Sequence, residues 1–194
     1  MQTSDIRQFF DGLAERWDQI CFHDPDKLRA ITALTQFPKE ANVADLACGT
    51  GAMLPYLLNK NPQSITAVDL SEQMIIRAKS KCIDPRVRFL VSDLFALEEN
   101  NFDTVILYSA YPHMPDKRAL ARKLSSLLLP GGRFLIAHSE GRAAINERHL
   151  DPDTAAVSIP LRPVWEEIES FCDWFEVDIQ IDTPEFYVFS GLKN

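Results

Sequence analysis

Short apolar runs separated by segments of helical periodicity make up most of the chain from residue 42 onward. Uninterrupted apolar runs of this length are typical of strands that are covered on both faces. The runs that predict strands are NVADLAC (42–48), SITAVDL (64–70), VRFLVSD (87–93), FDTVILYSA (102–110) and RFLIAHS (133–139). The helical stretches between them are AMLPYLLNK, SEQMIIRAKSK and DKRALARKLSSLL. Alternation of strand and helix predicts βαβ crossovers and hence a parallel sheet.

The two ends of the chain extend this pattern. FEVDIQID (175–182) alternates strictly between apolar and polar residues, and EFYVFSGL (185–192) follows a short Thr-Pro turn, which predicts an antiparallel hairpin. Near the start, apolar spacing predicts a helix over residues 3–21, and a second helix begins at Pro25 after the N-cap Asp24. VWEEIESFCDWF (164–175) is also helical in pattern.

We therefore expect an α/β fold: a Rossmann-like, doubly wound sheet of seven strands, mostly parallel, with an antiparallel C-terminal hairpin and helices on both faces. The 194 residues are predicted to form a single domain, in which 1–40 is an N-terminal helical lid and 41–194 is the core. Residues 139–163, which contain the longest irregular stretch, are a candidate second lid.

The amino-acid composition excludes some classes of binding partner. The formal net charge of -8 argues against a nucleic-acid binder, because such proteins carry a basic stripe. No apolar run approaches the roughly 20 residues of a membrane span, and the charged N-terminus lacks the apolar centre of a signal peptide. The four cysteines form no CxxC pair. We expect a cytoplasmic protein with no nucleic-acid or membrane partner; the sequence predicts no oligomeric state.

A glycine-rich loop follows the first predicted strand in VADLACGTGAML (43–54). Such a loop turns backbone N–H groups and a helix N-terminus toward a ligand. The dinucleotide fingerprint requires Gly or Ala where Leu54 stands, so it is not met. Asp69 and Asp93 stand at the ends of the next two strands, where carboxylates can bind ribose hydroxyls and an adenine amino group, respectively.

In these segments the chain resembles the class I S-adenosylmethionine (SAM) dependent methyltransferases. The segments that carry the resemblance are VADLACGTG (43–51), AVDLSEQMIIRAK (67–79), VSDLFAL (91–97), FDTVILYSAYPHMPD (102–116) and LLLPGGRFLI (127–136). The resemblance implies an enzyme that uses SAM and methylates a small molecule. The cofactor residues that it implies are Trp17 in the lid, Asp45, Ala47, Gly49 and Gly51 around the loop, Asp69 at the ribose, and Leu70, Met74, Asp93 and Leu94 around the adenine. Ala47 stands where the family's loop commonly begins with Gly.

Methyl transfer from a sulfonium needs the nucleophile held in line and water excluded, and a base helps when the nucleophile carries a proton. Histidine suits that role near neutral pH. The candidate catalytic residues are His113, His138 and His149, and the candidate substrate-binding residues are His23, Tyr108, Tyr111, Arg142 and Asn146. The predicted fold brings these residues to one side of the binding cleft, opposite the glycine loop.

Within HSEGRAAINERH (138–149), Arg142, Asn146 and His149 follow the i, i+4, i+7 spacing of one helix face. That face either binds an anionic acceptor or is exposed to solvent. SAYPH after the fourth strand does not match the Asn/Asp-Pro-Pro-aromatic motif of nucleic-acid amino-methylating enzymes, which favours a small-molecule acceptor.

Two other functions remain open at this point. The first is a metal-dependent enzyme, or one directed at a metal centre or thiol; no metal is expected otherwise, but His23, His113, His138 and His149 would then be the ligands. The second is a non-catalytic SAM-binding sensor or partner subunit.

Overall fold

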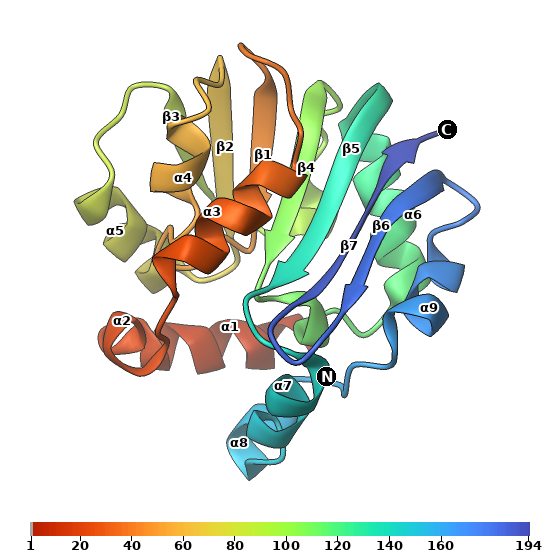
Figure 1. The fold of residues 1–194 in the computed structure, drawn as a ribbon. Coiled ribbons are helices and arrows are strands. Elements are labelled where there is room, and N and C mark those ends of the chain that lie inside the picture. The colour runs from red at the N-terminus through yellow and green to blue at the C-terminus, as the bar shows by residue number, and fades with distance from the viewer. Residues whose placement is uncertain (1) are drawn as a thin grey trace.

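The computed structural model describes residues 2–194, which form a central seven-stranded sheet (Figure 1). The strands are β1 (Asn42–Leu46), β2 (Ser64–Asp69), β3 (Val87–Val91), β4 (Phe102–Tyr108), β5 (Leu128–His138), β6 (Phe175–Asp182) and β7 (Tyr187–Lys193). Their order is β3-β2-β1-β4-β5-β7-β6. The first five strands pair in parallel, whereas β7 pairs antiparallel with both β5 and β6. The expected mostly parallel sheet with an antiparallel C-terminal hairpin is confirmed.

Helices cover both faces of the sheet. They are α1 (Thr3–Leu13), α2 (Trp17–Ile20), α3 (Pro25–Leu34), α4 (Leu54–Leu58), α5 (Glu72–Lys81), α6 (Lys117–Leu127), α7 (Arg142–Arg148), α8 (Pro152–Ala155) and α9 (Val164–Glu167), with 3-10 turns η1 (Leu94–Ala96), η2 (Tyr111–His113) and η3 (Ile168–Ser170). One apolar core lies between the sheet and α3, α4 and α5, and a second lies between the sheet and α6 and α9. Burial of apolar area in these two layers is the main source of stability.

Side-chain caps fix where several helices begin. Asp24 accepts hydrogen bonds from the backbone N–H groups of Asp26 and Lys27, and Pro25 occupies the first position of α3, as the sequence predicts. Ser71 caps α5 in the same way through the N–H of Met74.

The predicted N-terminal helix over residues 3–21 is instead two helices, α1 and α2, with a turn between them. The turn brings the Phe10 and Trp17 rings together edge to face, with centroids 5.6 Å apart. At the other end of the chain, the predicted helix over 164–175 shortens to α9, followed by η3 and a turn. Strand β5 begins at Leu128, five residues before the predicted start.

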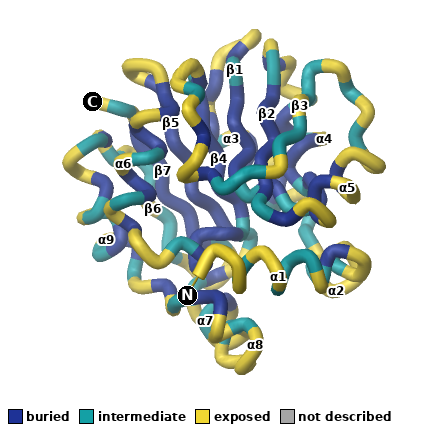
Figure 2. The backbone as a smooth tube through the Cα atoms, turned by 180° about the vertical axis from the view of Figure 1, so that it is seen from behind, coloured by how far each residue is buried: buried dark blue, intermediate teal, exposed yellow. Residues whose placement is uncertain are grey.

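The parallel strands end at one edge of the sheet, and α1 and α2 lie across this edge (Figure 1). Viewed from behind, the strands form a buried centre, while α1 and α8 are largely exposed (Figure 2). Within residues 2–194, no helix has both the length and the apolar character needed to span a bilayer. The loops that follow β1, β2, β3 and β4 meet beneath the two N-terminal helices.

Candidate functional site

A pocket lies at the carboxyl edge of the sheet, beneath α1 and α2. Its lining comes from the N-terminal segment (Thr3, Ile6, Phe10, Trp17, His23), the loop after β1 (Ala47, Cys48, Gly49, Thr50, Ala52), β2, the start of α5 and the loop after β3 (Val68, Asp69, Leu70, Met74, Ser92, Asp93, Leu94, Phe95), and the end of β4 with η2 (Tyr108, Ser109, Ala110, His113, Met114, Pro115). The predicted cofactor residues all line it except Asp45 and Gly51. We call the part at the glycine loop and the two aspartates the cofactor end. The part at His23, Tyr108 and His113 is called the acceptor end.

The glycine loop is wound through left-handed backbone conformations. Ala47, Gly49 and Gly51 have φ angles of 52°, 55° and 83°. A left-handed conformation costs an L-residue such as Ala47 about 1–2 kcal/mol, so this is a position that favours glycine. A Cβ atom on Gly51 would lie 2.9 Å from Cδ1 of Leu54, which would have to move, and the φ of 83° independently favours glycine at this position.

Backbone N–H groups hold the Asp69 carboxylate. Its Oδ2 accepts from Gly49 N and its Oδ1 from Ser71 N, both at 2.8 Å. Burial raises the pKa of Asp69 to about 6, and these two hydrogen bonds oppose the rise. The two bonds link the loops after β1 and β2, so the carboxylate is fixed at the edge of the pocket.

Asp45 is a buried carboxylate beside this loop. It is 1% exposed, and burial together with the nearby Asp69 raises its pKa to about 7. Among residues 2–194 its Oδ2 has no hydrogen-bond partner. A buried oxygen without a partner is unfavourable by about 1–3 kcal/mol, and a cation bound nearby would relieve that cost. Asp93, at the third strand end, accepts from Phe95 N at 2.9 Å and faces the pocket.

Two aspartates attach the N-terminal helices to the cofactor end. Asp11 accepts a hydrogen bond from Ser71 Oγ at 2.5 Å, and Asp18 accepts one from Thr50 Oγ1 at 2.6 Å. Asp18 also forms an ion pair with Lys81 of α5 at 2.8 Å. The sequence analysis did not identify these aspartates, although both lie on the polar side of the predicted helix.

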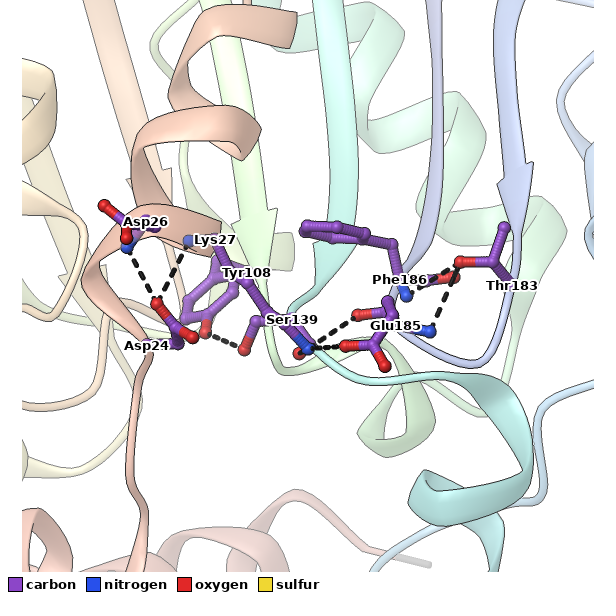
Figure 3. A network of polar contacts seen from close by, with 8 residues as sticks. All are labelled: Asp24, Asp26, Lys27, Tyr108, Ser139, Thr183, Glu185 and Phe186. Carbon is purple, nitrogen blue, oxygen red and sulfur yellow. Dashed lines mark hydrogen bonds and ion pairs between the residues drawn. The ribbon is translucent and has the colours of Figure 1, made fainter.

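At the acceptor end, three side chains form a hydrogen-bonded series. His23 Nδ1 lies 2.8 Å from the Tyr108 hydroxyl, which lies 2.8 Å from Ser139 Oγ (Figure 3 shows the Tyr108–Ser139 contact). Burial lowers the pKa of His23 and raises the pKa of Tyr108, so both groups are neutral at neutral pH. Ser139 is a residue that the sequence analysis missed, because a serine after a strand carries no distinctive pattern.

Lys27 fixes the surroundings of this series. Its Nζ donates to the Ser139 carbonyl at 3.2 Å and forms an ion pair with Glu185 Oε2 at 2.5 Å (Figure 3). Through these bonds α3 is joined to the loop after β5 and to the turn between β6 and β7.

The tautomer of His113 follows from its partner. Nδ1 lies 2.7 Å from the Val157 carbonyl, and a carbonyl only accepts, so Nδ1 carries the proton. Burial lowers the pKa of His113 to about 4, which leaves the ring neutral and Nε2 a free acceptor at neutral pH. Nε2 has no hydrogen-bond partner in the described chain, and the ring packs edge-on against Phe10 at a centroid distance of 5.0 Å. His113 thus presents an unprotonated ring nitrogen at the pocket wall, and its lowered pKa makes this nitrogen a weak base.

Five predicted acceptor residues lie outside the pocket lining of the described chain: Tyr111, His138, Arg142, Asn146 and His149. Tyr111 is fully buried and donates to Glu167 Oε2 at 2.9 Å. His138 is 4% exposed, and burial lowers its pKa to about 3. His149 packs edge-on against His113 at a centroid distance of 5.5 Å, and burial lowers its pKa. Within residues 2–194, His138 Nε2 and His149 Nδ1 are buried without partners.

The stripe on α7 points neither into the pocket nor freely into solvent, which corrects both expectations for it. Arg142 donates to Asp182 Oδ2 at 3.1 Å. Asn146 donates to the Leu161 carbonyl at 2.9 Å and accepts from the Leu161 N–H at 2.8 Å. The reason is a close contact before the helix: a Cβ on Gly141 would lie 2.4 Å from the Thr183 carbonyl, so α7 begins against the β6–β7 turn. Arg142 therefore offers no grip on an anionic acceptor in this geometry.

The described residues do not bring the four histidines together as a metal site. Over residues 2–194, no three His, Cys, Asp or Glu side chains are grouped as metal ligands. His23 and His113 use ring nitrogens for Tyr108 and the Val157 carbonyl instead.

Comparisons with known proteins agree with this architecture. A family model described as a methyltransferase domain matches residues 43–132. A ubiquinone biosynthesis O-methyltransferase of Xanthomonas axonopodis pv. citri is 30% identical over 140 residues, which are 66% of this chain and 58% of that protein. A 2-methyl-6-phytyl-1,4-hydroquinone methyltransferase of Synechocystis is 33% identical over 107 residues, which are 54% of this chain and 34% of that protein. The chain thus spans less than two thirds of these relatives.

Among solved structures, magnesium protoporphyrin IX methyltransferase from Synechocystis with bound S-adenosylhomocysteine (SAH) superposes with a TM-score of 0.76 at 17% identity, covering 100% of both chains. The overall fold is therefore shared.

Proposed function

We propose that this chain is a class I SAM-dependent methyltransferase that transfers a methyl group from SAM to a hydroxyl oxygen of a small-molecule acceptor, as the methyltransferase-domain match over residues 43–132 supports. The observation that carries the proposal is a single pocket whose two ends differ in chemistry. Carboxylates and a glycine loop line the cofactor end, and neutral histidine and tyrosine side chains line the acceptor end. In this proposal the segment up to residue 40 is the lid of a domain whose core is 41–194.

The residues at the cofactor end fit SAM, which has two cationic groups, a ribose diol and an adenine. Asp45, with its unpartnered Oδ2 among the described residues, provides a negative field for a cation in the adjacent pocket. The carboxylate of Asp69 would accept from the ribose hydroxyls, and Asp93 from the adenine amino group. Over residues 2–194, a Cβ on Gly49 would meet no atom within 4 Å, so the loop leaves room for close approach.

When bound, SAM would supply a methyl carbon that an acceptor oxygen attacks as the carbon–sulfur bond breaks, with its electron pair staying on sulfur. His113 Nε2 would take the proton that the acceptor hydroxyl loses, because this nitrogen is unprotonated and the His113 side chain lines the pocket. The His23–Tyr108 pair would orient the acceptor from the other side. Phe10, Trp17 and Met114 line the pocket with apolar surface and would exclude water.

A hydroxyl acceptor is favoured over the other nucleophiles for two reasons. Neutral imidazole and phenol groups match a neutral hydroxyl better than a charged group. The Xanthomonas relative is named as an O-methyltransferase.

Two measurements test the proposal. Calorimetry with SAH should give saturable binding, and incubation with radiolabelled SAM and a panel of phenols, thiols, amines and carboxylates should label a phenol. The proposal fails if SAH does not bind. The assignment of a hydroxyl oxygen as the methylated atom fails if the labelled products are confined to thiols, amines or carboxylates.

A further inference from the structure

A second groove meets the pocket at His23. It lies between the segment joining α2 to α3, the start of α4 and the end of α5. Its lining residues are Asp18, Cys21, Phe22, His23, Leu28, Gly51, Ala52, Pro55, Tyr56, Ala78, Lys81 and Cys82. His23 and Ala52 line both the groove and the pocket, so the two spaces are neighbours across these side chains.

The walls of the groove are apolar and aromatic. Phe22 is 84% exposed, and it stands at the groove together with Tyr56 and Leu28. The floor consists of small residues. These are Gly51, Ala52 and Ala78.

The groove carries no unpaired charge within its described lining. Asp18 and Lys81 are its charged residues, and they form an ion pair with each other at 2.8 Å. Burial raises the pKa of the Cys21 thiol, so that group is neutral at neutral pH. An aromatic wall, a floor of small residues and neutralised charges suit an uncharged apolar ligand.

We propose that this groove binds the apolar, non-reacting part of the methyl acceptor, and that the acceptor is an aromatic hydroxyl compound bearing an apolar side chain. The inference rests on the proposed function, because it places the reacting hydroxyl at the acceptor end near His113. From there the side chain passes His23 and lies along Phe22 and Tyr56. Phe22 is exposed in the free protein and becomes covered when the acceptor binds.

The test uses 4-alkylphenols as probes, from 4-methylphenol to 4-pentylphenol, titrated by calorimetry into the protein saturated with SAH. Each added methylene should tighten binding by up to about fourfold, the factor that corresponds to burial of one methylene. In Phe22→Ala most of this gain should disappear. Ile83→Ala is the matched control, because Ile83 is 94% exposed and lies outside the described groove lining. It should keep the full gain.

Three results would overturn the groove proposal: no phenol binding, affinities independent of alkyl length, or an undiminished gain in Phe22→Ala. The SAH titration separates this failure from failure of the proposed function. If SAH binds with equal affinity to the wild type and both variants while the alkyl gain is absent, the groove proposal alone falls. If SAH does not bind, the proposed function falls with it.

Discussion

At the cofactor end of the pocket, backbone N–H groups from two consecutive loops hold Asp69. At the acceptor end, side chains from distant segments hold one another: His23 precedes α3, Tyr108 ends β4 and Ser139 follows β5. A backbone-held site tolerates little change, whereas a site held by side chains can be rebuilt by substitution. The difference explains how one fold retains a cofactor while its relatives are named for different acceptors.

The largest expected effect is at the backbone-held end. We expect Asp69→Ala to weaken SAM binding by about 100-fold or more, because two charge-assisted hydrogen bonds to ribose are lost. Calorimetry with SAM measures this loss of affinity. Asp69→Asn keeps the size and shape of the side chain, so its affinity for SAM should lie between those of the wild type and Asp69→Ala. If Asp69→Ala bound SAM with unchanged affinity, Asp69 would have no role in cofactor binding, and the proposed difference between the two ends of the pocket would be wrong.

At the acceptor end, His113→Asn should lower turnover by about 100-fold while leaving SAM affinity unchanged. An asparagine amide can still donate to the Val157 carbonyl, as His113 Nδ1 does, but it offers no basic nitrogen. His113→Gln is the complementary variant, which gives up the Val157 contact. Wild-type turnover in His113→Asn would show that Nε2 takes no proton.

Asn146→Ala should destabilise the protein by about 2 kcal/mol, since the buried Leu161 backbone loses both of its partners. SAM affinity should not change. Glu147→Ala, at a neighbouring exposed position, is the control for stability measured by urea unfolding. A loss of turnover with unchanged stability would instead indicate that Asn146 contributes to acceptor binding.

Binding of SAM near pH 6.5 should release roughly half to one proton. The pKa of Asp45 is about 7 in the free protein, and a bound cation favours its ionised form and lowers that value. Affinity should therefore rise with pH through this range. Calorimetry in two buffers of different ionisation enthalpy counts the protons, and Asp45→Asn should abolish most of the release. Proton uptake would contradict the assignment.

The smallest expected effect is a gain in the stability of the folded protein. Ala47→Gly should stabilise the protein by about 1 kcal/mol, because glycine adopts the φ of 52° without strain, and the midpoint of thermal unfolding should rise by about 2–4 °C. Ala52→Gly, where the backbone is not left-handed, should be destabilising. A lower midpoint for Ala47→Gly would mean that the Cβ contributes packing that outweighs the strain.

These two ends also differed in how far the sequence could predict them. The strands and the glycine loop are local features, since buried apolar runs and a short motif place Asp69 and Asp93 without knowledge of the tertiary structure. His23, Tyr108 and His113 were expected at the acceptor side, and they line the pocket. Their roles remain predictions.

The orientation of α7 could not be predicted, because it depends on Gly141 packing against a turn more than 40 residues further along the chain. Helical spacing shows which residues share a face, but not what that face meets. Ser139 was missed for a related reason, since its partner Tyr108 lies in a neighbouring strand.

The attachment of the N-terminal helices has a kinetic consequence. Asp11 binds Ser71, whose own N–H holds Asp69, and Asp18 binds Thr50 of the glycine loop. The loops that we propose to contact the cofactor thus also hold the N-terminal helices above the pocket. If the cofactor binds as proposed, these bonds must open before it can be exchanged, so we expect cofactor release to be slow.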